Sequence, residues 1–423
     1  MKRLAAAALF ATLALPAQTE VTGSPIGFTP DLYAIELPCD DVAAALPFWR
    51  DALHWQLERE LLPAFAVLRQ GELRLLLRQT RQPKAAGSAP WLSINMRVGD
   101  FVAAIAAVEK TGGTVDDPRP RPFALGQAVA VRDPAGSAVH LLQVEKRPLA
   151  ADATPQVFNI GWHGRDLAAT ETFWTGLGHQ VFSRDFLPET LPMQRHGAAA
   201  LVFHHGDGLA ALAGKTRRPT VWLQVPELEP AAAALRSRAG KVIDAHPIAG
   251  PLGRHVRLRD PDGLTVGIVE RGPTRLWYER LWHLTGTWQA ESTKGWGNQI
   301  RYYPMAQGSV LVEDDPQGDR ANSMMSCIAM DGNRLLLTHW CHAGNAPRLC
   351  ADVAKATADS ITFTFLDGGN LASRDVGHMD EVTFTLQGTD RFATTWKWYQ
   401  DGKSQTFETI SHVRVPPGSS GAR

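Results

Sequence analysis

The stretch Asp41–Trp49 reads D-V-A-A-A-L-P-F-W and returns as D-L-A-A-T-E-T-F-W at Asp166–Trp174, 125 residues further along the chain. A second pair of matching stretches lies downstream, R-D-P-A-G at Arg132–Gly136 and R-D-P-D-G at Arg259–Gly263, which are 127 residues apart. Landmarks that keep one order and nearly one spacing indicate an internal repeat. Residues up to about 270 therefore hold two copies of a unit of about 120 residues.

Each copy divides into two halves of similar pattern. In the first half, an alternating run at Tyr33–Leu37 predicts a strand, and Asp41 is suited to cap a helix that runs to Leu53. Three strand-like runs follow, and the pattern then restarts with a strand from Trp91 and a helix that ends at Gly112-Gly113. A module of one strand, one helix and three further strands, used four times, is therefore predicted from about residue 30 to 270.

The helix that ends in Phe-Trp, the second helix that ends in Gly-Gly and the R-D-P-x-G hairpin together resemble the vicinal oxygen chelate superfamily. This superfamily includes glyoxalase I, bleomycin-resistance proteins and extradiol dioxygenases, and the resemblance covers roughly 240 residues. It implies two paired-module domains, for which we predict the boundaries 28–148 and 154–272, each with curved sheets around a central cavity. Because the superfamily hosts several chemistries and several non-catalytic binders, the fold alone does not assign a function.

Residues 274–423 carry a different pattern, in which tryptophan is dense and short alternating runs recur. The runs are Ile300–Tyr303, Arg334–His339, Ser360–Phe365, Glu381–Leu386, Phe392–Trp398 and Thr406–Val413. Asp331-Gly332 is typical of a tight hairpin turn, which would set Cys327 opposite Leu336. Gly286-Thr287-Trp288 resembles the G-x-W start of lipocalin-like barrels, in which the Trp closes one end. We therefore predict a lipocalin-like β-barrel at 280–415.

The predicted fold class is α+β, with two tandem paired βαβββ-module domains followed by an all-β lipocalin-like barrel. The N-terminus adds a targeting signal, because Lys2 and Arg3 precede the apolar run Leu4–Leu15 and the small-residue site Pro16-Ala17. Residues 1–17 are therefore predicted to be a signal peptide, and the mature protein is predicted to be periplasmic or secreted.

Composition excludes two classes of partner. Lys plus Arg and Asp plus Glu both number 43, so the net charge is zero and no nucleic-acid partner is predicted. No stretch after the first twenty residues is apolar over the length needed to span a bilayer, so no membrane span is predicted. The oligomeric state is left open.

The resemblance implies a divalent metal held by His, Gln or Glu on the first and last strands of the modules. The first-strand positions fall on Ala34, Ser93, Asn159 and Thr220, and the last-strand positions fall on His140 and Gly267. A lone histidine does not hold a catalytic metal. No cofactor is therefore predicted, and His140, Asn159 and His163 are retained only as cavity candidates. His204-His205 must point to opposite faces of a strand, so at most one of them faces a cavity.

A cluster in the barrel segment is the main candidate for ligand binding. His339, His342, Asn345, Arg348 and His378 bring imidazoles, an amide and a guanidinium close to a Gly/Pro loop. The guanidinium is suited to a carboxylate or phosphate oxygen. Two alternatives stand: the His/Cys set around Cys341 holds a metal or haem, or the loop uses its own polar groups to satisfy its backbone.

The four cysteines offer few constraints. Cys39 is predicted to be a small buried hydrophobe, and Cys341 and Cys350 flank one loop and could meet. The leading hypothesis is an exported protein that binds a small molecule on degenerate, metal-free repeats plus a barrel. The alternatives are a metal-dependent glyoxalase- or dioxygenase-type lyase or oxidoreductase, and a structural or protein-interaction scaffold.

Overall fold

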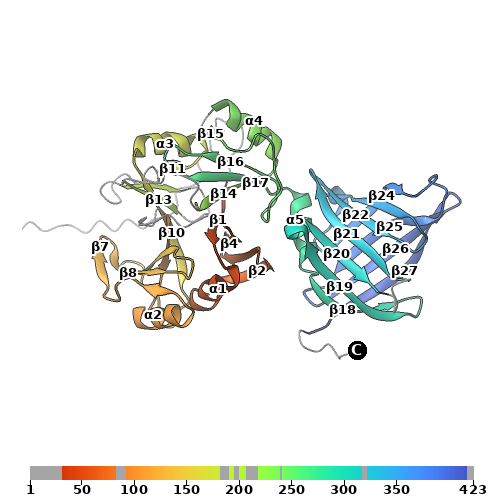
Figure 1. The fold of residues 1–423 in the computed structure, drawn as a ribbon, viewed down its shortest axis with the longest axis horizontal. Helices are drawn as coiled ribbons and strands as arrows, with labels where there is room; N and C mark the ends of the chain where they lie inside the picture. The colour runs from red at the N-terminus through yellow and green to blue at the C-terminus, as the bar shows by residue number, and fades with distance from the viewer. Residues whose placement is uncertain are drawn as a thin grey trace, which may run out of the picture.

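The computed structural model describes residues 31–81, 92–181, 190–194, 200–205, 218–238, 241–316 and 322–416, which form two open sheets and a closed barrel (Figure 1). The predicted signal peptide, residues 1–17, lies outside the described residues. Within them, no helix is both long and apolar enough to cross a membrane. The predicted α+β fold class, with paired modules followed by a barrel, is confirmed.

The first copy supplies two modules. The first contains β1 (Asp31–Cys39), α1 (Val42–Pro47), the π-helical turn η1 (Phe48–Ala52), β2 (Gln56–Leu61), β3 (Phe65–Gln70) and β4 (Leu73–Gln79). The second contains β5 (Leu92–Arg97), α2 (Phe101–Lys110), β6 (Thr114–Val115), β7 (Arg121–Phe123), β8 (Gly126–Arg132) and β9 (Ala138–Val144). The second helix ends before Gly112, whose φ of 82° suits glycine.

The second copy repeats this order. Its first module contains β10 (Gln156–Gly164), α3 (Leu167–Gly176), β11 (Gln180–Val181), β12 (Thr190–Gln194) and β13 (Ala200–His205). Its second module contains β14 (Thr220–Val225), α4 (Leu228–Arg238), β15 (Lys241–Val242), β16 (His255–Arg259) and β17 (Thr265–Glu270). The predicted helix starts are found where aspartates cap them: Asp41 accepts from the amide of Ala44 at 3.0 Å, and Asp166 accepts from Ala168 and Ala169.

The sheets cut across the two sequence copies. One sheet, here called sheet A, has the order β15-β16-β17-β14-β1-β4-β3-β2 and joins the first module to the fourth. The other, sheet B, has the order β11-β12-β13-β10-β5-β9-β8-β6, with β7 beside β8, and joins the second module to the third. The copies meet through the antiparallel pairs β1–β14 and β5–β10. Each copy, 28–148 or 154–272, therefore gives one module to each sheet.

One face of each sheet packs on the helices in a shared apolar core. Ile35 and Leu75 of sheet A and Ile94 and Ile160 of sheet B are fully buried in this core. Side chains alternate along a strand, so the residues between these positions belong to the opposite face of each sheet. Those opposite faces are where a ligand cavity would have to lie.

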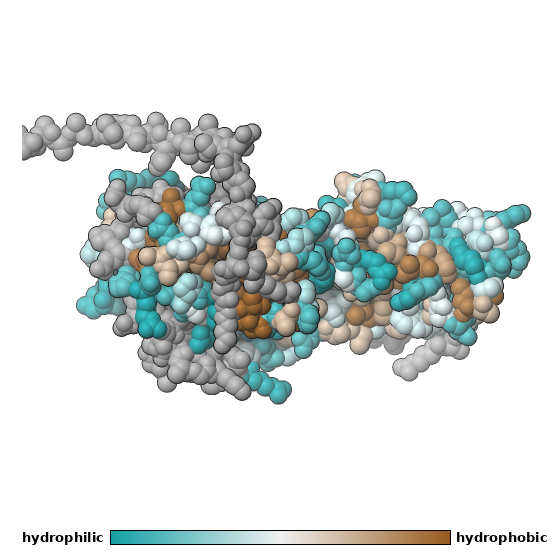
Figure 2. Space-filling view, turned by 90° about the horizontal axis from the view of Figure 1, so that it is seen from above, coloured by the Kyte–Doolittle hydropathy of each residue, from teal (hydrophilic) through white to brown (hydrophobic). Residues whose placement is uncertain are grey.

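Helix α5 (Pro273–Trp282) joins sheet A to the barrel (Figure 1). The alternating pattern after residue 274 predicted strands and no helix, which was wrong for this segment. Trp277, Tyr278, Leu281 and Trp282 recur at helical spacing, and all four are buried between sheet A and the barrel interior. Figure 2 shows the barrel as a separate lobe beside the sheets.

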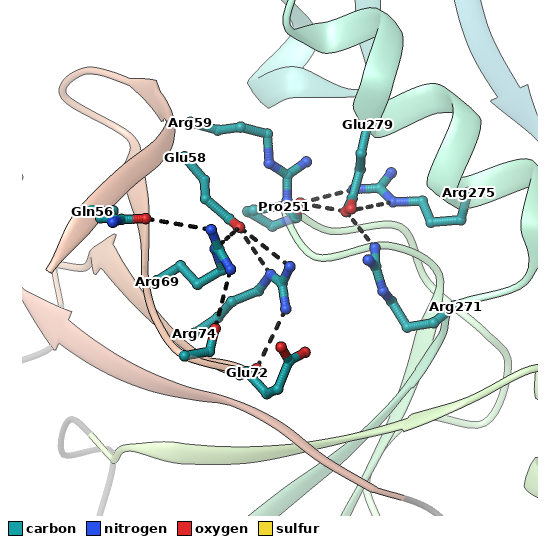
Figure 3. A network of polar contacts seen from close by, with 11 residues as sticks. Gln56, Glu58, Arg59, Arg69, Glu72, Arg74, Pro251, Arg271, Arg275 and Glu279 are labelled. Carbon is teal, nitrogen blue, oxygen red and sulfur yellow. Dashed lines mark hydrogen bonds and ion pairs between the residues drawn. The ribbon is translucent and has the colours of Figure 1, made fainter. Parts of the chain in front are cut away.

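A buried ion network fastens α5 to sheet A (Figure 3). The Glu279 carboxylate lies 3.2 Å from Arg59 of β2, 3.3 Å from Arg275 of α5 and 2.5 Å from Arg271, which follows β17. Burial alone would raise the pKa of Glu279, but Arg59, Arg275 and Arg271 together hold it at about 2. Glu279 is therefore ionised at neutral pH, and it compensates guanidinium groups from three segments of the chain.

The predicted barrel is confirmed as a closed, antiparallel structure. Its strands are β18 (Gly286–Ser292), β19 (Gly297–Met305), β20 (Val310–Asp315), β21 (Met324–Asp331), β22 (Arg334–Trp340), β23 (Ala346–Ala351), β24 (Ser360–Gly369), β25 (His378–Leu386), β26 (Arg391–Gln400) and β27 (Lys403–Arg414), with the short helical turns η3 (Ala306–Gly308) and η4 (Val353–Lys355) between them. Trp288 is buried, donates to Leu284 O at 2.7 Å and lies beneath the Arg414 guanidinium. This contact fits the predicted role of Trp288 in closing one end.

Two local predictions in the barrel were wrong. Asp331 pairs with Arg334, so the hairpin loop is Gly332-Asn333, with Gly332 at a φ of 61°, and Cys327 lies opposite Thr338, not Leu336. The shift is two residues, and side chains therefore keep the predicted face. The stretch from Ala346 onward, expected to be a loop, is strand β23.

None of the four cysteines forms a disulfide in the structure. Cys39 is fully buried in the core, as predicted for a small hydrophobe. Cys341 and Cys350 are both half-buried and form no disulfide with each other.

Candidate functional site

The barrel-side face of sheet A is filled by the protein's own side chains. At Gly267, the last-strand position where the resemblance would place a metal-ligating Glu, an added Cβ would lie 2.2 Å from the Trp222 indole. Trp222 donates to Glu36 at 3.0 Å, and the His255 ring packs edge-on against it with centroids 4.7 Å apart. Ala34 and Thr220 are buried on the same sheet. Sheet A therefore presents an indole where a metal would be bound.

The corresponding face of sheet B is polar. It carries Ser93, Asn95, His140, Asn159, His163 and His204, which occupy adjacent strands β9, β5, β10 and β13. Asn95 donates to Asn159 at 2.5 Å, and Asn95 Oδ1 lies 2.9 Å from His140 Nδ1. The rings of His163 and His204 are 5.7 Å apart, and His205 is exposed. The structure thus groups the predicted cavity candidates His140, Asn159 and His163 on one face.

Burial lowers the pKa of the three imidazoles grouped on this face of sheet B. Burial, with the neighbouring His163 and His140, lowers the pKa of His204 to about 4. Burial, followed by the charge of His163, lowers the pKa of His140, and burial also lowers that of His163. A protonated His163 would therefore disfavour the protonation of His140 and His204.

The donor set of sheet B does not fit the divalent metal that the resemblance implies. The amides of Asn95 and Asn159 bond to each other and to His140, and no carboxylate belongs to this group. In the part of the chain that the structure describes, no group of three or more His, Cys, Asp or Glu side chains is arranged to hold a metal ion. No metal-dependent step is therefore derived from these residues.

The five residues predicted at the barrel mouth do not share one surface. His339 is buried and faces the barrel interior with Leu335 and Leu337. Arg348 lies on the outside, where it pairs with the exposed Asp367, and His342 is also exposed.

Asn345 and His378 lie close together, and both make their contacts with neighbouring residues of the barrel. Asn345 is buried and donates to Gly377 O at 2.9 Å, next to His378. The His378 ring packs against Phe365 and Tyr399, with centroids 4.6 and 5.4 Å away, and its nitrogens contact Arg374 and Val376 O. Of the five, His339 alone lines the cavity described next.

A small cavity opens into the interior of the barrel. Its lining combines carboxylates, a hydroxyl and an imidazole with indole, thioether and aliphatic groups. The lining residues are Trp296, Ile300, Glu313, Asp315, Met324, Met325, Ser326, His339, Met379, Trp396, Glu408 and Ile410.

A row of cross-strand neighbours supplies Glu313, Ser326 and His339 to the polar wall of this cavity. Tyr302, Glu313, Ser326 and His339 lie side by side on β19, β20, β21 and β22, and their register turns all four inward. Tyr302 donates to Glu313 Oε1 at 2.6 Å, and Ser326 Oγ lies 3.0 Å from His339 Nδ1. Cross-strand pairing thus sets two hydrogen-bonded pairs beside each other, Tyr302 with Glu313 and Ser326 with His339.

Two further carboxylates complete the polar lining. Glu408 of β27 accepts a hydrogen bond from Trp296 Nε1 at 2.9 Å, and Asp315 accepts from Asn298 Nδ2 at 2.7 Å. Both carboxylates are buried.

Burial controls the protonation of the row. Burial raises the pKa of Glu313, against the opposing effect of hydrogen bonds from Ser326 and Tyr302. Burial lowers the pKa of His339 to about 4, so its ring is neutral at pH 7. Its Nε2 has no hydrogen-bond partner among the described residues.

The sequence analysis singled out His339 and missed Glu313, Asp315, Ser326 and Glu408. A signal was present in the run Val310–Asp315, because Leu311, Glu313 and Asp315 alternate and so share a face. Acidic residues that continue the inward series of a barrel strand indicate a polar interior.

Comparison with known proteins gives a family match for part of the chain. Residues 34–142 match the family of glyoxalase-like domains, and they span the first two modules, which contribute to both sheets. Among curated proteins, none matches the chain.

Solved structures resemble the repeat region at low identity. Glyoxalase I from Zea mays is 16% identical, with a TM-score of 0.45 over 60% of this chain and 96% of that chain. A variant of homoprotocatechuate 2,3-dioxygenase from B. fuscum is 17% identical, with a TM-score of 0.23 over 59% of this chain and 74% of that one. A lactoylglutathione lyase from Agrobacterium tumefaciens is 21% identical, with a TM-score of 0.21 over 26% of this chain and 90% of that one.

Proposed function

We propose that this protein, in which a glyoxalase-like domain is joined to a β-barrel, binds a small molecule in the barrel cavity. The observation that carries the proposal is the cavity in the barrel interior with Glu313, Ser326 and His339 in its lining. Small-molecule sites in proteins combine apolar walls with a few placed polar groups. The lining of the barrel cavity has this composition.

The repeat region acts in this proposal as a scaffold without a metal. Trp222 fills the space beside Gly267 on sheet A, and α5 covers that face. In this proposal the ligand therefore does not bind on sheet A. The same helix packs against the barrel, in which Trp288 is buried beneath the Arg414 guanidinium. In this proposal the ligand occupies the part of the barrel interior that Glu313 and His339 line.

A pair of tryptophan substitutions tests the binding site. Met324→Trp enlarges a half-buried side chain of the cavity lining, whereas Val413→Trp adds the same bulk to an exposed position on β27. Compounds that raise the melting temperature of the full chain in a small-molecule screen should lose their effect with Met324→Trp and keep it with Val413→Trp. The proposal fails if the two variants respond alike, and absence of any stabilising compound would favour the structural-scaffold alternative.

The second candidate function is a metal-dependent lyase or oxidoreductase on sheet B. The observation in its favour is that His140, His163 and His204 share one face. Elemental analysis of the full chain purified without chelator separates the two functions. We expect Fe, Mn, Ni and Zn all below stoichiometric amounts; one equivalent of metal that is lost in His140→Ala would establish the second candidate.

We further propose that the protein is exported, as the basic and apolar pattern of residues 1–17 suggests. N-terminal sequencing of protein from its native host should give a mature start near Gln18, in the periplasmic or secreted fraction. An intact Met1 on protein from the cytoplasmic fraction would contradict export.

A further inference from the structure

We propose that helix α5 couples the barrel to sheet A, so that it docks on both or on neither, and that its docking holds the barrel turn η3 (Ala306–Gly308) in a strained conformation. Undocking of α5 would let this turn relax and would uncover one end of the barrel and one face of sheet A in a single step. The coupling needs no ligand and goes beyond the proposed binding function. Three observations support it: the position of α5, the contacts of Trp282 and the backbone of the turn.

Helix α5 lies across one end of the barrel. The Tyr278 hydroxyl donates to Gly308 O at 3.0 Å, in the turn between β19 and β20, and Arg280 donates to Ala358 O, between β23 and β24. In a barrel of consecutive antiparallel strands, these two connections lie at the same end. The helix is therefore hydrogen-bonded to the barrel at two connections that are far apart in sequence.

The same helix is held by sheet A through charge. Glu279 pairs with Arg59 of β2 and with Arg271, which follows β17. The side chains of the two arginines are only 3% and 8% exposed. Separation of a buried ion pair is costly, because it leaves uncompensated charge in a poorly hydrated place. Departure of α5 from sheet A therefore breaks several contacts at once.

Trp282 contacts both the barrel and sheet A with one side chain. Its ring lies 6.3 Å from the Phe65 ring of β3, centroid to centroid, and the Arg59 guanidinium lies 5.6 Å from its centroid. A Cβ added at Gly308 of the barrel would lie 2.6 Å from Trp282 Cη2 and 3.1 Å from Phe65 Cζ. Gly308, Trp282 and Phe65 thus meet at one point. Because interiors are close-packed, movement of α5 away from one partner disturbs its packing on the other.

The turn that meets Trp282 has a strained backbone. Ala306 and Gln307 have φ values of 49° and 54°, in the left-handed region that is costly for most residues with a side chain. Of the non-glycine residues with positive φ in the described part of the chain, only these two are adjacent. Both side chains are exposed, so their own packing does not impose the conformation.

Helix α5 supplies contacts that hold the turn in this conformation. Gly308 continues the left-handed series with a φ of 82°, accepts the Tyr278 hydrogen bond and packs on Trp282. A strained backbone persists where the surrounding contacts over-determine it. Because both contacts come from α5, undocking would remove them and allow the turn to adopt a more favourable conformation. The turn thus favours release of the helix, and the helix contacts oppose it.

Hydrogen exchange followed by mass spectrometry on the full chain tests the coupling, because amides exchange when the structure around them opens. Tyr278→Phe removes the hydroxyl that joins α5 to the barrel. We expect exchange to become about fivefold faster in both residues 297–315 of the barrel and residues 56–70 of sheet A, as loss of one hydrogen bond predicts. Tyr302→Phe is the matched control, since it removes a buried hydroxyl that donates to Glu313 within the barrel, and it should affect the barrel alone.

A second pair of variants tests the strain. Gln307→Gly relieves the left-handed strain at an exposed position of the turn. Asp401→Gly makes the same change at a φ of 51° in the β26–β27 hairpin, at the other end of the barrel. Because docking holds the turn under strain, Gln307→Gly should favour the docked state and slow the exchange of residues 56–70 by about fivefold. Asp401→Gly should leave the exchange of residues 56–70 unchanged.

Strands β5 and β9 of sheet B are the internal reference for all four variants. Unchanged exchange in Tyr278→Phe, or faster exchange confined to the barrel, would overturn the coupling, since α5 would then leave the barrel without leaving sheet A. Equal responses of residues 56–70 to Gln307→Gly and Asp401→Gly would overturn the role of the turn. A change in β5 and β9 as large as that in residues 56–70 would show that the chain opens as one unit, and the coupling would then not be a property of α5.

Discussion

Trp49 donates a hydrogen bond from its indole nitrogen to the buried carboxylate of Asp133, at 3.1 Å. The two residues belong to the two motifs that mark the repeat, the helix that ends in Phe-Trp and the R-D-P-x-G hairpin. Trp49 lies in the first module and Asp133 in the second, so the bond joins a module of sheet A to a module of sheet B. Trp174 and Asp260 hold the equivalent positions in the second copy.

Loss of this bond should destabilise the repeat region. Trp49→Phe removes the indole donor and leaves the Asp133 oxygen buried with one partner fewer, at an expected cost of ~1–3 kcal/mol in the free energy of unfolding. Trp55→Phe is the control, because Trp55 is equally buried and its Nε1 has no partner among the described residues. Urea unfolding followed by circular dichroism measures both, and equal losses would show that the Asp133 bond contributes nothing.

The second hairpin aspartate should give the protein a pH-dependent stability. Burial raises the pKa of Asp260 from 3.8 to about 7. Because the folded state holds this proton more tightly than the unfolded state does, the contribution is complete below pH 4 and is lost as the pH rises through about 7. The wild-type unfolding free energy should fall by up to ~1.4 kcal/mol per pH unit across this window, relative to Asp260→Asn. Parallel pH curves for the two proteins would contradict the assignment.

The ion network under α5 should be sensitive to its single central carboxylate. Glu279→Gln leaves buried guanidinium groups of Arg59, Arg271 and Arg275 without compensation, at an expected cost of ~3–5 kcal/mol. Glu58→Gln removes a more exposed carboxylate from the neighbouring cluster in Figure 3 and should cost no more than ~1 kcal/mol. Because the pKa of Glu279 is lowered from 4.5 to about 2, its contribution is present above pH 4.5 and is lost as the pH falls through about 2. Guanidinium-free urea titrations at pH 7 and pH 3 measure both effects.

The filled position on sheet A makes a steric prediction. Gly267→Ala places a methyl group 2.2 Å from the Trp222 ring, so the indole must move and the unfolding free energy should fall by ~1–3 kcal/mol. Gly176→Ala is the matched control, since nothing lies within 4 Å of the added carbon. In the helix α3, that change should instead be neutral or stabilising by up to ~1 kcal/mol. Tolerance of Gly267→Ala without loss would mean that Trp222 does not occupy the position in solution.

Local features of the fold could be predicted from the sequence because short stretches determine them. Asp41 caps its helix as predicted, and Asp100 and Asp166 cap theirs in the same way, since an N-cap needs only its own side chain and the next turn. Helix α5 was missed because its tryptophans resemble strand residues in composition, although their spacing is helical.

The cavity could not be predicted in the same way because it depends on register. The row from Tyr302 to His339 exists only when four strands align residue by residue, and no single strand carries more than one member. His339 was noticed for its neighbours Cys341 and His342, which do not line the cavity. The hydrogen-bond partner of His339 is instead Ser326, on the strand before its own, and Glu313 lies opposite Ser326 on the strand before that.

The pairing of β1 with β14 and of β5 with β10 bears on the history of the chain. Either copy alone would present two half-sheets, each ending in a bare antiparallel edge that its sister strand normally satisfies. Two identical copies could satisfy those edges mutually, giving a symmetric pair of chains in which every sheet is shared. Duplication and fusion of such an ancestor would convert a contact between subunits into one within a single polypeptide. In such a fused chain the two halves no longer have to be identical, and here the two sheets differ, with a helix packed on sheet A and imidazoles on the corresponding face of sheet B.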